Sequence, residues 1–111
     1  VRDVLTALNT GHDGGWATIH ANGAREAPAR LSALGALAGM AEEAVAAQAA
    51  SALDAVLHMR RSPCGHRWVS EVGVLTRARG PLECAVALSA TASGQVTTHE
   101  AWASLARKAG L

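Results

Sequence analysis

Residues 10–22 read Thr-Gly-His-Asp-Gly-Gly-Trp-Ala-Thr-Ile-His-Ala-Asn, and they determine how the rest of the chain is interpreted. The run 16–19 is apolar and ends in the β-branched pair Thr18-Ile19, which favours a strand. The preceding Asp-Gly-Gly, residues 13–15, is typical of a turn that needs permissive backbone angles. A turn followed by a strand holds His12 at one end and His20 at the other. The pattern therefore predicts that two imidazoles converge on one anionic group.

Hydrophobic spacing outward from this stretch predicts alternating helices and strands. The chain is expected to open with the end of a helix over 1–9, followed by the strand over 16–20. A second helix begins near Pro28, carries Leu31, Leu34 and Leu37 on one face, and ends at Gly39. A third helix begins at the acidic pair 42–43, where carboxylates suit the helix dipole.

The second half of the chain is predicted to be richer in strands. Apolar runs at 55–59 and 67–75 flank the turn sequence Ser-Pro-Cys-Gly at 62–65, so they are predicted to form a hairpin. A further apolar run occupies 84–88, and a short strand is expected at 95–98. A final helix is predicted over 99–109.

Composition indicates one small domain. The chain has 111 residues, half of them apolar, and its aromatic residues are three tryptophans. The net charge is +1, which gives no strong attraction to nucleic acid or to membrane. No apolar run is long enough to span a bilayer, and no signal-like leader opens the sequence.

The two cysteines predict neither a redox motif nor a metal centre. Cys64 and Cys84 form no Cys-x-x-Cys unit and fit a reducing cytoplasm. Cys64, His66 and His58 offer a possible ligand set, but no second short-spaced pair completes a tetrahedral site, so no metal is expected.

Several segments together resemble the secretion ATPases. Residues 5–14 and 17–22 are similar to the histidine box of that family, with the Tad/CpaF-type ATPases of pilus assembly and type II/IV secretion as the best match in pattern. The resemblance continues through Pro-Ala-Arg-Leu at 28–31, Gln48, Ala-Leu-Asp-Ala-Val-Leu-His at 52–58 and the pair Arg60-Arg61. It covers about residues 1–75, and residues 76–111 read as a divergent tail.

The phosphate-binding half of such an enzyme has no counterpart in this sequence. P-loop enzymes hold phosphates with a Gly-x-x-x-x-Gly-Lys-Ser/Thr loop, and none occurs here; the one lysine is Lys108. The acidic strand that holds magnesium in such motors is expected just before Val1. The fold class implied is therefore α/β: a partial RecA-like P-loop NTPase domain, three-layered with a truncated sheet, followed by a C-terminal hairpin, a short strand and a last helix. Residues 1–111 would be one partial domain, the C-terminal half of the motor.

The resemblance also implies a function for the complete protein and roles for particular residues. The family forms homo-hexameric rings at the cytoplasmic face of the inner membrane, works with the membrane secretion platform, and uses ATP and Mg²⁺ to drive pilin assembly or protein export. His20 and His12 would sense or neutralise charge on the terminal phosphate, with Thr10 and Gly11 completing the nucleotide-binding turn. Arg30, Arg60 and Arg61 are candidates for contact between subunits. No nucleic acid is expected as a partner.

Alternatives remain for the residues and for the whole chain. His20 would equally suit a backbone hydrogen bond at a strand end, His12 a solvated turn, and the three arginines exposed positions. Without the phosphate loop and magnesium strand, this chain is expected neither to bind ATP tightly nor to hydrolyse it. Because its sheet would be cut, it is expected to self-associate. The alternative functions are a non-catalytic subunit that docks on a complete secretion ATPase, or a decayed gene remnant.

Overall fold

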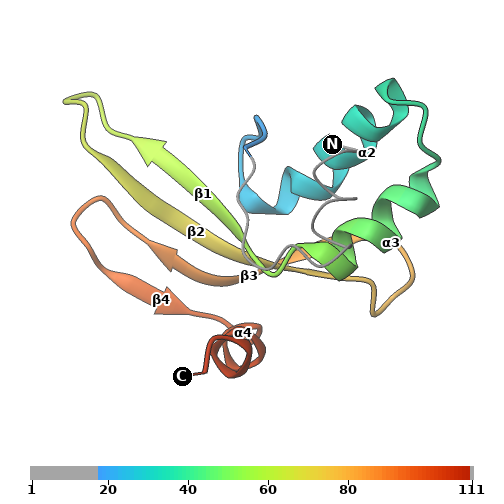
Figure 1. Ribbon diagram of the computed structural model, residues 1–111. Coiled ribbons are helices and arrows are strands. Elements are labelled where there is room, and N and C mark those ends of the chain that lie inside the picture. Colours follow the sequence, from blue (N-terminus) through green and yellow to red (C-terminus); the bar gives the residue numbers. More distant parts are fainter. Residues whose placement is uncertain (1–17, 111) are drawn as a thin grey trace.

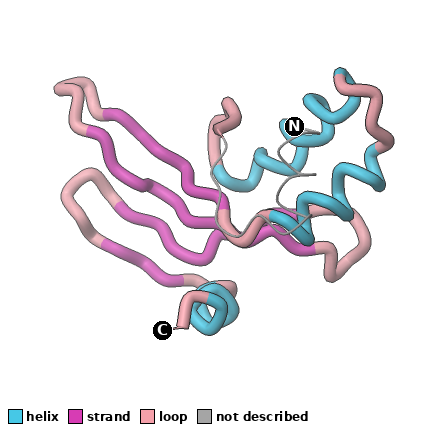
Figure 2. Tube along the Cα trace, in the orientation of Figure 1, coloured by secondary structure: helices cyan, strands magenta, loops and turns pink. Residues whose placement is uncertain are grey.

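The computed structural model describes residues 18–110, which form helices and an antiparallel sheet (Figures 1 and 2). The predicted helix over 1–9, together with Thr10, Gly11 and His12, lies outside the described residues. In chain order the elements are η1 (Ala24–Glu26), α2 (Ala27–Leu37), α3 (Glu42–Ala52), β1 (Val56–Arg61), β2 (Arg67–Thr76), β3 (Glu83–Ala90), β4 (Val96–Thr98) and α4 (Trp102–Lys108).

The two middle helices are confirmed, and local signals explain their bounds. Pro28 occupies the first turn of α2, where its missing N–H is not needed. Gly39, with φ of 78°, follows the end of that helix. The predicted apolar face is correct for Leu31, which is buried, but wrong for Leu37, whose side chain is 86% exposed at the last turn. The inner face of α3 is formed by Val45, Ala46 and Ala49, all buried.

The four strands pair in the order β1-β2-β3-β4, each antiparallel to the next. The predicted hairpin over 55–75 is confirmed, and the runs at 84–88 and 95–98 also form strands. By contrast, the strand predicted over 16–20 is not found at its described residues, 18–20, which lie in a loop. A strand needs a hydrogen-bonding partner, and no described strand pairs with this segment. The parallel pairs expected of a RecA-like sheet do not occur among the described strands.

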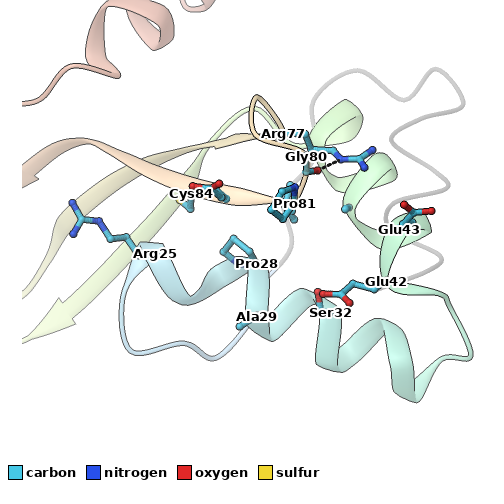
Figure 3. A pocket seen from close by; sticks show the side chains of 13 residues that line it. Arg25, Pro28, Ala29, Ser32, Glu42, Glu43, Arg77, Gly80, Pro81 and Cys84 are labelled. Atoms are coloured by element: carbon cyan, nitrogen blue, oxygen red, sulfur yellow. Dashed lines mark hydrogen bonds between the residues drawn. The ribbon is translucent and has the colours of Figure 1, made fainter.

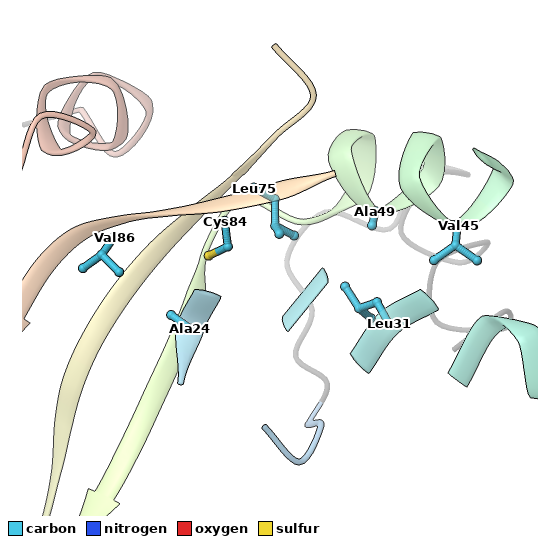
Figure 4. Close-up of a cluster of buried hydrophobic side chains, with 7 residues drawn as sticks. All are labelled: Ala24, Leu31, Val45, Ala49, Leu75, Cys84 and Val86. Carbon is cyan, nitrogen blue, oxygen red and sulfur yellow. The ribbon is translucent and has the colours of Figure 1, made fainter. Parts of the chain in front are cut away.

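The core lies where α2, α3 and η1 meet one end of the sheet (Figure 4). Its buried members combine small side chains with leucines and valines: Ala24, Leu31, Val45, Ala49, Leu75, Cys84 and Val86. Gly35 on α2 admits the side chain of Val45, and a Cβ at that position would overlap Val45 Cγ2. The two helices can therefore approach closely only because one contributes a glycine.

The final helix, α4, follows β4 in the chain and packs against β3 (Figure 1). Trp102, Leu105 and Ala106 are its half-buried residues, as its predicted apolar face requires. Lys108 Nζ lies 3.7 Å from Asp54 Oδ1, but both side chains are largely exposed, so this ion pair contributes little stability. Among residues 18–110 no helix has both the length and the apolar character needed to cross a membrane.

Candidate functional site

His20 presents an imidazole to solvent from the loop that precedes η1. The residue is exposed, and its ring makes no hydrogen bond or ion pair with the described part of the chain. Within residues 18–110, neither ring nitrogen of His20 has a hydrogen-bond partner. A neutral imidazole can donate one hydrogen bond and accept another, and an imidazolium donates two. The arrangement suits contact with an anionic oxygen.

The loop that carries His20 is hydrogen-bonded to the sheet at Ala24, a few residues after the histidine. The backbone N–H of Ala24 donates to Glu71 Oε1 at 3.0 Å, across 47 residues of sequence. The N–H of Asn22 donates to Glu26 Oε2 at 2.9 Å. Ile19, on the other side of the histidine, packs against the hydrophobic core. His20 is therefore an exposed group on a segment anchored at both ends.

A close approach of η1 to β2 completes this anchor. Ala24 is 1% exposed, and a Cβ placed on Gly73 would lie 3.2 Å from the Ala24 Cβ and would overlap Cys84 Sγ. Glycine at position 73 thus lets the backbone after His20 rest on the sheet. Only a very small residue fits there, so the distance between the histidine loop and β2 depends on position 73.

Glu71 is the residue of this site that sequence reasoning missed. The signal available in the sequence was a single carboxylate among apolar or small residues, in Val-Ser-Glu-Val-Gly-Val at 69–74. A charged side chain in the middle of such a strand usually has a specific partner. The partner, the Ala24 amide, could not be deduced from local pattern because it belongs to a segment far away in sequence.

The other predicted residues are not brought to His20 by the described structure. Thr10, Gly11 and His12 lie outside the described residues. Arg30 is exposed on α2, and Arg60 and Arg61 are exposed at the end of β1. Val56, at the start of β1, packs against the core. Five strand residues at ~3.3 Å each place Arg61 roughly 16 Å further along. No hydrogen bond or ion pair among residues 18–110 joins Arg60 or Arg61 to His20.

An open cleft of about 970 Å³ lies between α2, the start of α3 and the β2–β3 turn (Figure 3). Its charged lining consists of Arg25, Glu42, Glu43, Arg77 and Glu83. The Nε–H of Arg77 donates to the carbonyl of Gly80 at 3.0 Å. His20 does not line this cleft, so the cleft and the predicted phosphate-sensing residue are separate features.

The pKa values of the two cysteine thiols shift in opposite directions. Burial raises the pKa of the Cys84 thiol to about 11, and the nearby Glu71 carboxylate adds to the shift while Arg25 opposes it. Cys64 is exposed in the β1–β2 turn, where a hydrogen bond with Ser62 Oγ at 3.0 Å lowers the thiol pKa, helped by the His66 backbone. Within residues 18–110, no three His, Cys, Asp or Glu side chains come together in a way that would hold a metal ion.

Comparisons with known proteins identify the family of this chain. A family model described as "Type II/IV secretion system protein" matches residues 1–109. The chain is 47% identical over 83 residues to the "Putative conjugal transfer protein Rv3659c" of Mycobacterium tuberculosis strain H37Rv, and equally to the "Putative conjugal transfer protein MT3759" of strain CDC 1551. These alignments cover 75% of this chain and 24% of each relative, so the chain matches about a quarter of the length of those proteins. With nearly its whole length matched by the family model, the chain belongs to the type II/IV secretion system protein family.

Proposed function

We propose that this chain is the C-terminal part of a RecA-like motor domain in a secretion ATPase of the Tad/CpaF type. In the complete protein, a phosphate loop and a magnesium-binding strand would hold ATP and Mg²⁺, and hydrolysis would drive pilin assembly or export. His20 would contact the terminal phosphate, with Thr10, Gly11 and His12 contributing from the same histidine box. The family match over residues 1–109 supports this assignment.

The observation that carries the role of His20 is its combination of exposure and anchoring. The imidazole has no partner among the described residues, while the backbone beside it is tied to Glu71 and to the core. A hydrogen-bond donor aimed at developing negative charge is effective when its position is held before the ligand arrives. Loss of the terminal phosphate would remove the contact, so the same group suits a sensor of nucleotide state.

ATP chemistry in the assembled motor would be divided between segments. Mg²⁺ and the phosphate loop neutralise charge on the transferred phosphoryl group when they are present. This chain would contribute the imidazole of His20, held in position by its loop. Because that loop is exposed, it would not shield the phosphate from water. The isolated chain is therefore expected to show no Mg²⁺-dependent ATP turnover above that of a His20→Ala control, and measurable turnover would refute this division.

The decisive experiment supplies a phosphate loop and a magnesium-binding strand in trans. The chain is mixed with a separately produced segment of a complete family ATPase that carries the phosphate loop and magnesium strand, and ATP turnover is followed. His20→Ala is expected to lower kcat by about 10²-fold, as removal of a preorganised donor does. His99→Ala, which removes another exposed imidazole, is the matched control and should retain turnover. Equal kcat in the two variants would contradict the proposal.

A reconstituted pair that binds but never turns over would instead favour the docking subunit. In that case the chain would co-purify with a complete secretion ATPase and change its rate without contributing His20. The His20→Ala variant would then modulate the complete enzyme as well as the native chain does, which separates the two functions.

A further inference from the structure

The β1–β2 turn is built around Ser62. The N–H of Ser62 donates to the His66 carbonyl at 2.8 Å, and the N–H of Gly65 donates to the Ser62 carbonyl at 2.9 Å. Ser62 Oγ accepts the N–H of His66 at 3.2 Å and is hydrogen-bonded to Cys64 Sγ at 3.0 Å. With Gly65 at φ of 92°, this is a three-residue hairpin loop whose last residue is left-handed. The loop therefore holds the Ser62 hydroxyl in place at the end of the hairpin, which projects from the sheet (Figure 1).

The β3–β4 turn repeats this construction around Thr91. The N–H of Thr91 donates to the Gln95 carbonyl at 2.9 Å, and the N–H of Gly94 donates to the Thr91 carbonyl at 3.0 Å. Thr91 Oγ1 accepts the N–H of Gln95 at 3.1 Å and is hydrogen-bonded to Ser93 Oγ at 2.9 Å. Gly94, like the glycine of the first turn, has a φ of 92°. Thr91 therefore occupies in this turn the place that Ser62 occupies in the β1–β2 turn.

The two turns differ in the charge beside them. Arg61 and Arg67 are the cross-strand partners that flank the β1–β2 turn, and Ala90 and Val96 are the corresponding partners at the β3–β4 turn. Arg60 adds a third cation to the first turn, and residues 58–67 contain no aspartate or glutamate. The neutral turn shows that the loop geometry does not need arginine, and like charges placed opposite each other destabilise a hairpin. The arginines therefore indicate a requirement other than folding of the turn.

The Arg61 side chain reaches over the turn. A Cβ on Gly65 would lie 3.6 Å from Arg61 Nη2 and 3.9 Å from its Nε, so the guanidinium rests beside the loop that holds Ser62. Arg60, two residues before Ser62, is on the same side of the extended chain as that serine. Among residues 18–110, none of the guanidinium groups of Arg60, Arg61 and Arg67 has a hydrogen bond or ion pair. An anion carried by Ser62 would therefore have arginine donors close to it.

We propose that Ser62 is a phosphorylation site and that Arg60, Arg61 and Arg67 hold the phosphoryl group. A phosphoserine carries about −1.5 to −2 charge at pH 7 and three strong acceptor oxygens, and it orders a loop when it lies opposite an arginine cluster. Guanidinium and phosphate pair through two parallel hydrogen bonds. The modification thus supplies the counter-charge that the hairpin lacks. It does not depend on the function proposed for His20.

The transfer uses ATP as phosphoryl donor and a serine kinase as catalyst. Ser62 Oγ forms a bond to the γ-phosphorus, the bond from that phosphorus to the β–γ bridging oxygen breaks, and ADP leaves. The hydroxyl proton passes to the catalytic base of the kinase. As an ester oxygen, Ser62 Oγ can still accept the N–H of His66. The hydrogen bond with Cys64 Sγ, in contrast, loses the hydroxyl proton.

Phosphorus NMR tests whether the arginines hold the phosphoryl group. Phosphoserine is placed at position 62 during synthesis of the chain, and the matched control carries phosphoserine at position 91 of Thr91→Ser, in the turn without arginines. The second pKa of phosphoserine is ordinarily about 6. At position 62 this pKa should be lower than at position 91 by roughly 0.5–1, because nearby cations favour the dianion. Arg61→Gln with Arg67→Gln should abolish the difference, and circular dichroism checks that each variant is folded.

The thiol in the same turn gives a second readout. Iodoacetamide should alkylate Cys64 at least about threefold more slowly when position 62 carries phosphate, because the Ser62 hydroxyl that lowers the thiol pKa is gone and a dianion lies beside the sulfur. Phosphoserine at position 91 of Thr91→Ser should leave the rate of Cys64 alkylation unchanged.

Mass spectrometry of the complete protein recovered from its own cells tests whether the site is used. Phosphate is expected on Ser62 and not on Thr91, and Ser62→Ala should remove it. Equal phosphate pKa values at positions 62 and 91, an unchanged rate of Cys64 alkylation, or a Ser62 without phosphate in cells would each overturn the inference.

A titration with inorganic phosphate separates the modification from a free ligand. Binding of inorganic phosphate to the unmodified chain, lost in Arg61→Gln and accompanied by an unmodified Ser62 in cells, would assign the arginines to a free anion and overturn the inference. None of these outcomes bears on the effect of His20→Ala on turnover, which is measured in the reconstituted enzyme.

Discussion

Replacing Glu71 with alanine is expected to lower the free energy of unfolding by about 1–3 kcal/mol. The Ala24 amide would lose its acceptor, and Ala24 is 1% exposed, so water cannot readily replace it. An unpaired buried donor costs ~1–3 kcal/mol, and hydrogen bonds to charged groups contribute ~1.5–3 kcal/mol. Glu71→Gln retains a carbonyl acceptor in place of the carboxylate and should lose only about half as much.

Urea unfolding followed by tryptophan fluorescence measures this effect. With an m-value of ~1.5 kcal/mol per molar, a loss of about 2 kcal/mol moves the midpoint by roughly 1.3 M. The substitution has a second signature, because the Glu71 carboxylate contributes to the raised pKa of Cys84. Both variants should therefore bring the Cys84 pKa down from about 11.

The urea midpoint and the Cys84 titration each have an outcome that would contradict this prediction. If Glu71→Ala unfolds at the same urea concentration as the native chain, the Ala24 contact does not anchor the histidine loop. If stability falls but the Cys84 titration is unchanged, the carboxylate does not lie where the structure has it. Glu83→Ala, another acidic residue of the sheet with an exposed ion pair, is the control and should change stability by less than about 0.5 kcal/mol.

Three further predictions concern packing and the thiols. Gly35→Ala should lower the free energy of unfolding by about 1–3 kcal/mol in the same urea assay, because the added methyl overlaps Val45 in a filled core. An unchanged urea midpoint would contradict the close packing of α2 on α3. The contribution of Cys84 to stability should be fully present below pH 9 and should be lost as pH rises from 9.0 towards about 11, by up to about 3 kcal/mol, because the thiol ionises first in the unfolded chain. Unfolding at a series of pH values checks this, and Cys84→Ala should remove that part of the slope. Iodoacetamide should modify Cys64 well before Cys84. Ser62→Ala should slow the modification of Cys64, because loss of the Ser62 hydrogen bond raises the Cys64 pKa. Equal labelling rates for the two thiols would contradict this.

Local signals were sufficient to predict most elements of this fold. Pro28, Gly39 and the acidic start at Glu42 delimit two helices, and each of these residues acts on the backbone within one turn of itself. The turn over 62–65 likewise joins two strands that are neighbours in sequence. Such features need no knowledge of the rest of the molecule, which is why they can be read from sequence pattern.

Features that depend on distant contacts were not predictable in the same way. Leu37 continues the apolar spacing of its helix, yet the helix extends past the core and leaves that side chain exposed. Glu71 acquires its role from an amide 47 residues earlier. The strand expected at His20 has no described partner in the sheet, and hydrogen bonding rather than β-propensity decides that outcome.

The strand order has a consequence for how the molecule reaches its native state. Strands β1 to β4 are neighbours in space in the same order as in the chain, so each ladder closes a short loop and the sheet can assemble by successive local steps. The bond between Ala24 and Glu71 instead closes a long loop and is expected to form late. In native-state hydrogen exchange, the β2 and β3 amides should then be protected more strongly than the Ala24 amide, so that the histidine segment opens while the sheet persists.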